Sequence, residues 1–234
     1  MDSEKNFETY LLIGVNNFII SIKEKENLET IHEKKINFKN SSNALDYDKL
    51  SDFLNQNIFN IEKSLNYFIK DIYIILDYKE FLPIRVSIKK NNNGNLISMN
   101  DLIYSLNELK NYCKKTLEKK KIIHMLIDNY IIDGKSYSNL KTNLNCDNFS
   151  LNVRFICLPL NIIENLEKIL EKYQIAIKQI VEANYVNDFF KDSGKDIFFN
   201  AKEIILGRNT NEVTLLEKSK KNRGFFEKFF NFFS

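Results

Sequence analysis

The chain has 234 residues, of which 28% are charged and 44% hydrophobic, with only two prolines and a formal net charge of +3. This length allows one large domain or two small ones with a real hydrophobic core. The positive charge gathers near the C-terminus and forms no basic, aromatic surface through the body, which argues against nucleic-acid binding as the main activity.

The first part of the chain predicts a small sheet and one long helix. Tyr10 to Ile22 is an apolar, β-rich run broken by G-V-N-N, which indicates two strands about a tight turn. Two further β-type stretches follow at 28–31 and 35–39. Apolar residues recur at steps of three and four from 46 to 70, which predicts an amphipathic helix. The apolar run at 72–76 is typical of a buried strand.

A second unit begins near Pro83. Its patterns predict strands at 85–90, 122–132, 149–158 and 175–186, helices at 98–119 and 161–173, and a polar loop at 133–148. Ser98 and Asn161 are the expected helix N-caps. Such an order predicts two helices on one face of a mostly antiparallel sheet. A final helix is expected at 198–207, ended by Gly207.

The cysteines and histidines predict neither disulfides nor a metal site. Cys113, Cys146 and Cys157 are odd in number and form no C-x-x-C pair, which is typical of buried thiols in a reducing compartment. His32 and His124 lack neighbouring ligand patterns, so we expect no zinc site. The acidic, polar start of the chain has no signal-sequence pattern, and we expect a cytoplasmic protein.

The stretch from Lys220 to Ser234 carries six phenylalanines behind a basic run. Wound as an α-helix, the six rings share one arc of about 160°, opposite Glu227, Lys228 and Asn231. The segment is too short to span a bilayer, but it can lie in the interface among anionic headgroups. The predicted membrane-binding residues are Lys220, Lys221, Arg223, Phe225, Phe226, Phe229, Phe230, Phe232 and Phe233.

A helix docked on the protein's own core or on a partner is the alternative interpretation of this tail. The six rings with a dense basic lead-in favour the membrane. Full burial of a Phe side chain contributes at most about 3 kcal/mol. We therefore expect reversible binding by one copy and firm attachment when several copies are linked.

Several segments resemble FtsA, the actin-like bacterial division protein. I-I-H-M-L-I-D-N-Y-I-I-D-G-K, at 122–135, resembles the I-L-H-V-x-P-Q-x-Y-x-V-D-G-Q stretch of that family. The residues in register are Ile122, His124, Leu126, Tyr130, Asp133 and Gly134. The strand at 149–157 stands where the family has R-L-E-V-x-V-H-I. I-V-E-A-N around Glu182 resembles its L-E-P-L-A-S. FtsA proteins also end in a basic linker and a short amphipathic membrane helix.

The resemblance also places 11–22 over the family's first phosphate-binding hairpin, L-D-I-G-T-T-K-V-x-A-L-I. Gly14 is kept, but Leu12 replaces the acidic residue that would hold magnesium or its water, and Asn16 and Asn17 stand at hydroxyl or basic positions. We expect this degenerate hairpin to bind no nucleotide cofactor and no metal. After Glu182 the family continues into a second lobe, which we expect this shortened protein to lack.

The resemblance implies an α+β fold. It would be a partial actin-like (ribonuclease H-like) lobe with an inserted strand-helix-strand-strand module and a C-terminal amphipathic helix. The expected parts are 1–83 for the first part of the lobe, 84–186 for the inserted module, 187–209 for the closing helix, and 210–234 for the basic linker and membrane helix.

In function, the resemblance implies a non-catalytic scaffold that tethers division proteins, FtsZ among them, to anionic lipids on the cytoplasmic face of the inner membrane. Self-association is a further expected property. Without the second lobe, binding of other division proteins through 84–186 is easier to retain than direct FtsZ contact. The alternatives are a PilM-like pilus-assembly adaptor, which shares the fold but normally lacks a Phe-rich tail, and an actin-like ATP-binding protein.

Overall fold

The computed structural model describes residues 6–39, 44–140 and 144–213. The chain divides into two compact units. Among the described residues, unit 1 comprises those up to Phe81 together with Leu158–Leu206, and unit 2 comprises those in Leu82–Cys157 together with 207–213. The described chain contains both strands and helices, with runs of consecutive strands, which confirms the predicted α+β class.

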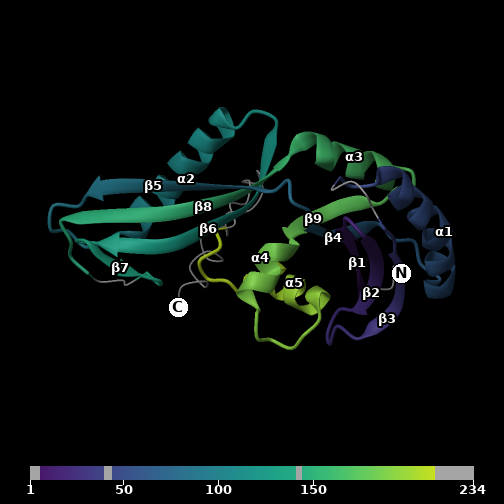
Figure 1. Cartoon of the computed structure of the whole chain (residues 1–234). Helices are drawn as coiled ribbons and strands as arrows, with labels where there is room; N and C mark the ends of the chain where they lie inside the picture. Colours follow the sequence, from purple (N-terminus) through teal and green to yellow (C-terminus); the bar gives the residue numbers. More distant parts are fainter. Residues whose placement is uncertain (1–5, 40–43, 141–143, 214–234) are drawn as a thin grey trace, which may run out of the picture. The chain divides into compact units, whose positions relative to one another are not determined.

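Unit 1 is a five-stranded sheet with helices on both faces (Figure 1). Its strands are β1 (Phe7–Gly14), β2 (Asn17–Glu24), β3 (Thr30–Asn37), β4 (Asp71–Asp77) and β9 (Ala176–Glu182). Its helices are α1 (Tyr47–Leu65), α3 (Leu160–Glu171), α4 (Ala183–Phe189) and α5 (Ile197–Ile205). The strand order is β3-β2-β1-β4-β9, antiparallel from β3 to β1 and parallel from β1 to β9.

The two faces of this sheet can be followed through two ring contacts. The Phe18 ring lies 6.0 Å from the Phe53 ring of α1 on one face. The Tyr10 ring, on the opposite face, lies 6.0 Å from the Phe198 ring of α5. Because helices cover both faces, the inner strands are apolar on both sides, as the run at 72–76 predicts.

The predicted hairpin at 10–22 is confirmed as β1 and β2, whereas three other boundaries differ. The two expected β stretches at 28–31 and 35–39 are the single strand β3. Helix α1 begins after its N-cap Asp46 but ends at Leu65, because Asn66 takes the left-handed conformation with φ of 51°. Residues 176–182 form β9, but the chain then enters α4 instead of continuing the strand expected over 175–186. A short apolar run does not by itself distinguish a strand from a helix.

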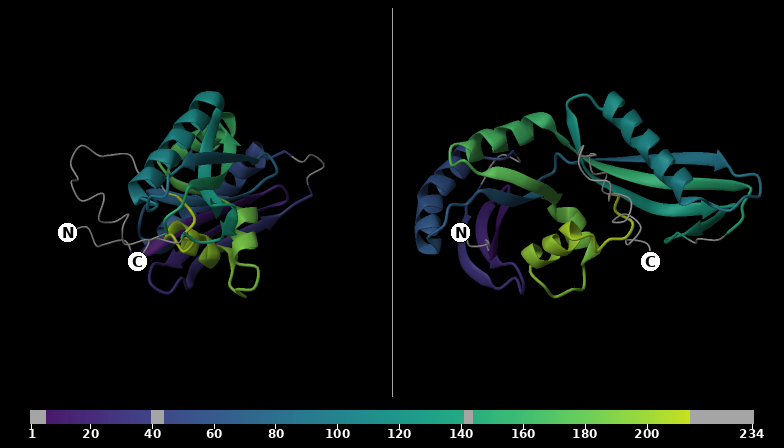
Figure 2. Two further views of the ribbon diagram at one scale, coloured as in Figure 1. Left: turned by 90° about the vertical axis from the view of Figure 1, so that its left-hand side faces the viewer. Right: turned by 180° about the vertical axis from the view of Figure 1, so that it is seen from behind.

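Unit 2 has its own sheet and core. Its elements are β5 (Leu82–Asn91), α2 (Met99–Thr116), β6 (Lys120–Ile132), β7 (Lys135–Tyr137) and β8 (Asn148–Pro159). The strand order is β5-β8-β6-β7, and β5 pairs antiparallel with β8 from Leu82↔Cys157 to Asn91↔Asn148. Helix α2 lies on one face of the sheet (Figure 2). Its residues Leu102, Leu106 and Leu109 belong to the core of this unit.

Unit 2 has different boundaries from the inserted module expected at 84–186. Strand β9 pairs in parallel with β4 along Asp71↔Ala176 to Leu76↔Glu182, so α3 and β9 belong to unit 1. The sequence pattern of 160–186 is that of a helix and a buried strand, and such a pair could pack on the sheet of either unit. Hydrogen bonding to β4, a distant segment of the chain, places it in unit 1.

The expected polar loop at 133–148 contains a hairpin instead. Asp133 and Gly134 have positive φ values of 44° and 81°, which the two-residue turn between β6 and β7 requires. The Asp133 carboxylate then accepts hydrogen bonds from the Asp147 and Asn148 amides at 3.0 and 2.8 Å. The Asp-Gly pair is the sequence signal that predicts this turn.

All three cysteines are free and buried, as the sequence predicts. Burial raises the pKa of the Cys113 and Cys146 thiols. It also raises the pKa of the Cys157 thiol, to about 11. At pH 8 Cys157 should therefore carry roughly two hundredfold less thiolate than an exposed cysteine. We expect slow maleimide labelling of the native protein and fast labelling in urea, followed by mass spectrometry. Complete native labelling within minutes would contradict this prediction.

Candidate functional site

The predicted phosphate hairpin lies at the turn between β1 and β2. Leu12 is 8% exposed and its Cα neighbours across the sheet are Ile19 of β2 and Ile75 of β4. The position that would hold a magnesium-binding carboxylate is therefore aliphatic, among aliphatic neighbours. An acidic group placed there would lose its hydration without gaining a cation partner on either neighbouring strand.

The turn itself is filled by its own side chain. A Cβ atom added to Gly14 would lie only 2.3 Å from Oδ1 of Asn17, so the Asn17 amide packs over the glycine. The Asn16 carbonyl accepts a hydrogen bond from the Phe38 amide at 2.9 Å. The hairpin thus contains Leu12, Gly14, Asn16 and Asn17, and it offers aliphatic and amide groups where a site for nucleotide and magnesium needs a hydroxyl group for the phosphate and a carboxylate for the metal.

Within 6–39, 44–140 and 144–213, no group of three or more His, Cys, Asp and Glu side chains is arranged to hold a metal ion. None of the described helices has both the length and the apolar composition that a bilayer crossing requires. The predicted membrane-binding residues, from Lys220 to Phe233, lie outside the described residues.

After α5 the chain enters unit 2 and adds to the edge of β6. The Ile127 amide donates to the Asn211 carbonyl and the Val213 amide donates to the Met125 carbonyl, both at 2.8 Å. Residues 210–213, expected to be linker, are therefore part of a folded unit. The sequence does not predict this pairing with β6, because four residues are too few to show the alternation of apolar and polar residues that indicates a strand.

A buried pair adds a side-chain contact to this edge. Nδ1 of His124 lies 2.6 Å from Oε1 of Glu212, and the two side chains are 0% and 11% exposed. His124 is therefore a buried histidine with a side-chain partner inside unit 2. Its partner lies eighty-eight positions along the chain, so no local pattern could have revealed it.

A charged cluster lies on the sheet face of unit 2 away from α2. The Asp128 carboxylate lies 3.0 Å from Arg154 and 3.7 Å from Arg85, whose side chain is 75% exposed. The neighbouring Ser87 hydroxyl donates to Asn152 at 2.5 Å. Arginine, lysine and serine alternate with apolar residues along β5. The alternation at 85–90 predicts the strand, but it does not by itself predict a charged surface.

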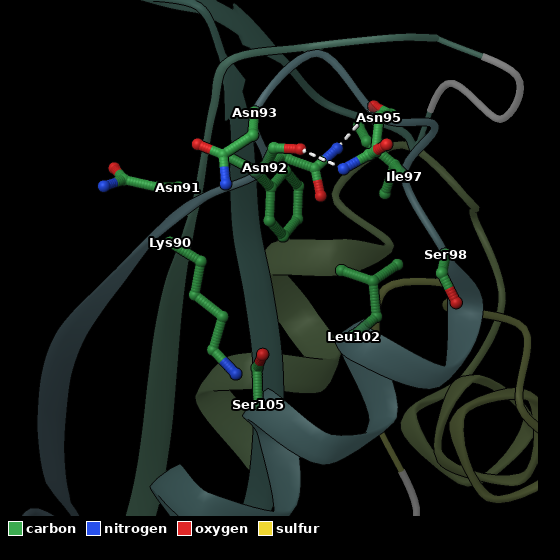
Figure 3. A pocket seen from close by; sticks show the side chains of 10 residues that line it. Lys90, Asn91, Asn92, Asn93, Asn95, Ile97, Ser98, Leu102 and Ser105 are labelled. Atoms are coloured by element: carbon green, nitrogen blue, oxygen red, sulfur yellow. Dashed lines mark hydrogen bonds between the residues drawn. The ribbon is translucent and has the colours of Figure 1, made fainter.

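A pocket of about 170 Å³ lies where the Asn-rich loop meets the start of α2 (Figure 3). The Asn92 and Asn95 side chains each donate to the other's backbone carbonyl, so they mainly hold the loop. Lys90 is engaged by Glu108 at 3.4 Å and by the Tyr104 ring at 4.7 Å. Asn92, Asn95 and Lys90 thus have partners inside unit 2, and we assign the pocket no ligand.

The chain is distantly similar to several solved structures. No model of a known protein family matches the chain, and no curated protein matches it. Solved structures do. The chain is similar to a PilM–PilN type IV pilus biogenesis complex, with a TM-score of 0.46 and 6% identity over 80% of this chain and 50% of that one.

Two further structures have the same kind of similarity. The cytoplasmic domain of EpsL, an inner-membrane component of the type II secretion system of Vibrio cholerae, has a TM-score of 0.37 and 10% identity, over 76% of this chain and 59% of that one. A Bacteroides thetaiotaomicron protein of unknown function with an actin-like ATPase fold has a TM-score of 0.31 and 15% identity, over 79% and 56%.

The chain spans between 50% and 59% of the length of these three structures. The described residues form a mixed α+β fold, and the Bacteroides protein is the one of these three structures that is described as having an actin-like ATPase fold. The comparisons give no specific identification of the FtsA family.

Proposed function

We propose that the protein is a non-catalytic, membrane-associated adaptor. One observation carries the proposal: the last described segment, 211–213, is hydrogen-bonded to β6, and the basic, Phe-rich stretch begins five residues further on, at Lys218. A membrane contact made by that stretch would therefore hold unit 2, through its sheet, near the membrane surface.

The length of the connection limits how far unit 2 could lie from a membrane. Twelve residue steps separate Val213 from Phe225, and an extended chain covers about 3.5 Å per residue, so the reach is at most about 40 Å. Unit 2 has its own core and an exposed strand edge. It would thus present a protein-binding surface close to the bilayer.

The adaptor function is tested by removing the stretch after Val213. The full chain should co-sediment with vesicles containing anionic lipid, and a chain ending at Val213 should stay in the supernatant with an unchanged circular dichroism spectrum. If the shortened chain sediments as well as the full chain, the folded units bind the membrane themselves and the proposed attachment is wrong.

Two kinds of assembly fit such an adaptor. The sequence resemblance implies a division complex that includes FtsZ, and the second candidate is a pilus or secretion complex, the kind to which the PilM and EpsL structures belong. Co-purification with FtsZ from cells would support the first, and co-purification with inner-membrane pilus or secretion proteins would support the second.

The adaptor proposal also predicts that the protein does not bind ATP with magnesium, because Leu12 has no carboxylate and Asn17 fills the space over Gly14. Isothermal titration with ATP and magnesium should give only the heat of dilution, while an active actin-like ATPase run in parallel gives a binding curve. Micromolar affinity would favour the ATP-binding alternative.

A further inference from the structure

Strand β5 is a long edge strand. Its ten residues, Leu82–Asn91, pair with β8 on one side, and in the part of the chain that the structure describes no strand pairs with its other side. Each residue of a strand except proline has one backbone donor and one acceptor, and at an edge strand about half of these groups point outward. The free edge of β5 can therefore take a further strand.

The apolar side of β5 is only partly covered. Ile84, Val86 and Ile88 pack against the core of unit 2 but remain half-buried, because no neighbour covers them on the outer side within the described residues. An added strand would place its alternate side chains beside these three. Apolar residues there would extend the core under α2.

The other side of β5 is positively charged. Arg85 and Lys89 alternate with Ser87 on this side, and β5 has no acidic residue. Asp128 lies near Arg85, but it makes its closer contacts with Arg154. Lys89 has no ion pair among the described residues. Acidic side chains on an added strand would lie directly beside Arg85 and Lys89.

We propose that β5 binds an extended segment of a partner protein in which acidic residues alternate with apolar ones. The added strand would hydrogen-bond to the free edge, with its apolar residues next to Ile84, Val86 and Ile88 and its carboxylates next to Arg85 and Lys89. This inference rests on the proposed adaptor function and names the chemistry of the partner.

Charge argues against two other occupants of the edge. A second copy pairing through its own β5 would bring Arg85 and Lys89 of both copies onto one face, and like charges on neighbouring strands repel. The C-terminal stretch of this chain is itself basic, with lysine or arginine at 218, 220, 221, 223 and 228. An acidic partner is the occupant that the charges favour.

A competing explanation is that Pro83, Arg85 and Lys89 only protect the edge against aggregation, as proline and charged residues do on many edge strands. Such protection would resist pairing with any strand. The proposal instead predicts pairing that depends on the sign of the partner's charge, and this difference can be measured.

The test uses the full chain and a fluorescent synthetic peptide of alternating glutamate and valine. One control peptide replaces glutamate by lysine, and another has the same composition in two blocks. We expect saturable anisotropy binding for the alternating glutamate peptide only. We also expect slower amide hydrogen exchange in the bound protein at 84–91.

The variant Arg85→Glu with Lys89→Glu should weaken binding of the glutamate peptide at least about tenfold and create binding of the lysine peptide. The matched control, Lys121→Glu with Lys135→Glu, makes the same charge change at exposed positions on β6 and β7 and should leave binding unchanged. Circular dichroism checks the folding of both variants.

Equal binding of the block peptide, protection outside 84–91, or full binding by the doubly reversed variant would overturn the proposal, as would the absence of any binding. The peptide experiment contains no membrane and the sedimentation experiment contains no peptide. Failure of strand pairing is therefore distinguished from failure of membrane attachment.

Discussion

Replacing Phe229 and Phe230 together by glutamate should abolish co-sedimentation with anionic vesicles and leave the body folded. Both rings belong to the apolar arc of the sequence pattern, where each carboxylate would have to be desolvated or withdraw the segment from the interface. Half-burial of two rings contributes about 3 kcal/mol, so the partition coefficient should fall at least about a hundredfold. Circular dichroism of the variant is the folding control.

The basic lead-in provides the matched test. Reversing Lys220, Lys221 and Arg223 to glutamate should weaken binding more at low salt than at high salt, because dissolved ions screen the attraction of exposed charges to anionic headgroups. Sedimentation of the double glutamate variant at the level of the parent would mean that the tail packs on protein.

Asp196→Asn should destabilise unit 1 because it leaves Lys23 unpaired. Nζ of Lys23 lies 2.7 Å from Asp196 Oδ2 and 2.8 Å from Thr30 Oγ1, and the lysine side chain is only 3% exposed. Removing one member of a buried pair leaves an uncompensated charge. Because Asp196 is 51% exposed and water can reach the site, we expect a loss of about 2–3 kcal/mol in the free energy of unfolding.

Two further variants separate the ion pair from the helix cap. Asp196 also caps α5 by accepting from the Phe199 amide at 2.7 Å, a role that asparagine retains, so Asp196→Ala should cost about 1 kcal/mol more. Lys23→Met removes the buried charge and should stay within about 1 kcal/mol of the parent. Urea unfolding at pH 7 measures all three, and a neutral Asp196→Asn would refute the buried-charge argument.

The same pair predicts a dependence on pH. Burial raises the pKa of the Asp196 carboxyl, but hydrogen bonds from the Lys23 ammonium and the Phe199 amide outweigh it and hold the pKa below its usual value. A lowered folded-state pKa means that this stabilisation is complete above about pH 4 and disappears as the pH falls through the folded value. The stability difference between the parent and Asp196→Asn should therefore narrow in acid, because a protonated Asp196 no longer compensates the Lys23 charge.

Local patterns determined most of the secondary structure. Apolar residues at steps of three and four predict α1, the run at 72–76 predicts β4, and the G-V-N-N break predicts the turn between β1 and β2. These patterns work because each reflects which side of one element is buried. The missed turn at Asp133–Gly134 also has a local cause, a residue pair that tolerates positive φ.

Pairing between distant segments was decided only by the tertiary structure. The sequence by itself determined that 176–182 is apolar enough to be a strand, but its hydrogen bonds to β4 rather than to unit 2 come from residues about a hundred positions away. The same holds for the His124–Glu212 contact and for the free edge of β5. A strand's own residues specify which faces are buried, whereas its neighbours across the sheet depend on the closure of long loops, which no short pattern records.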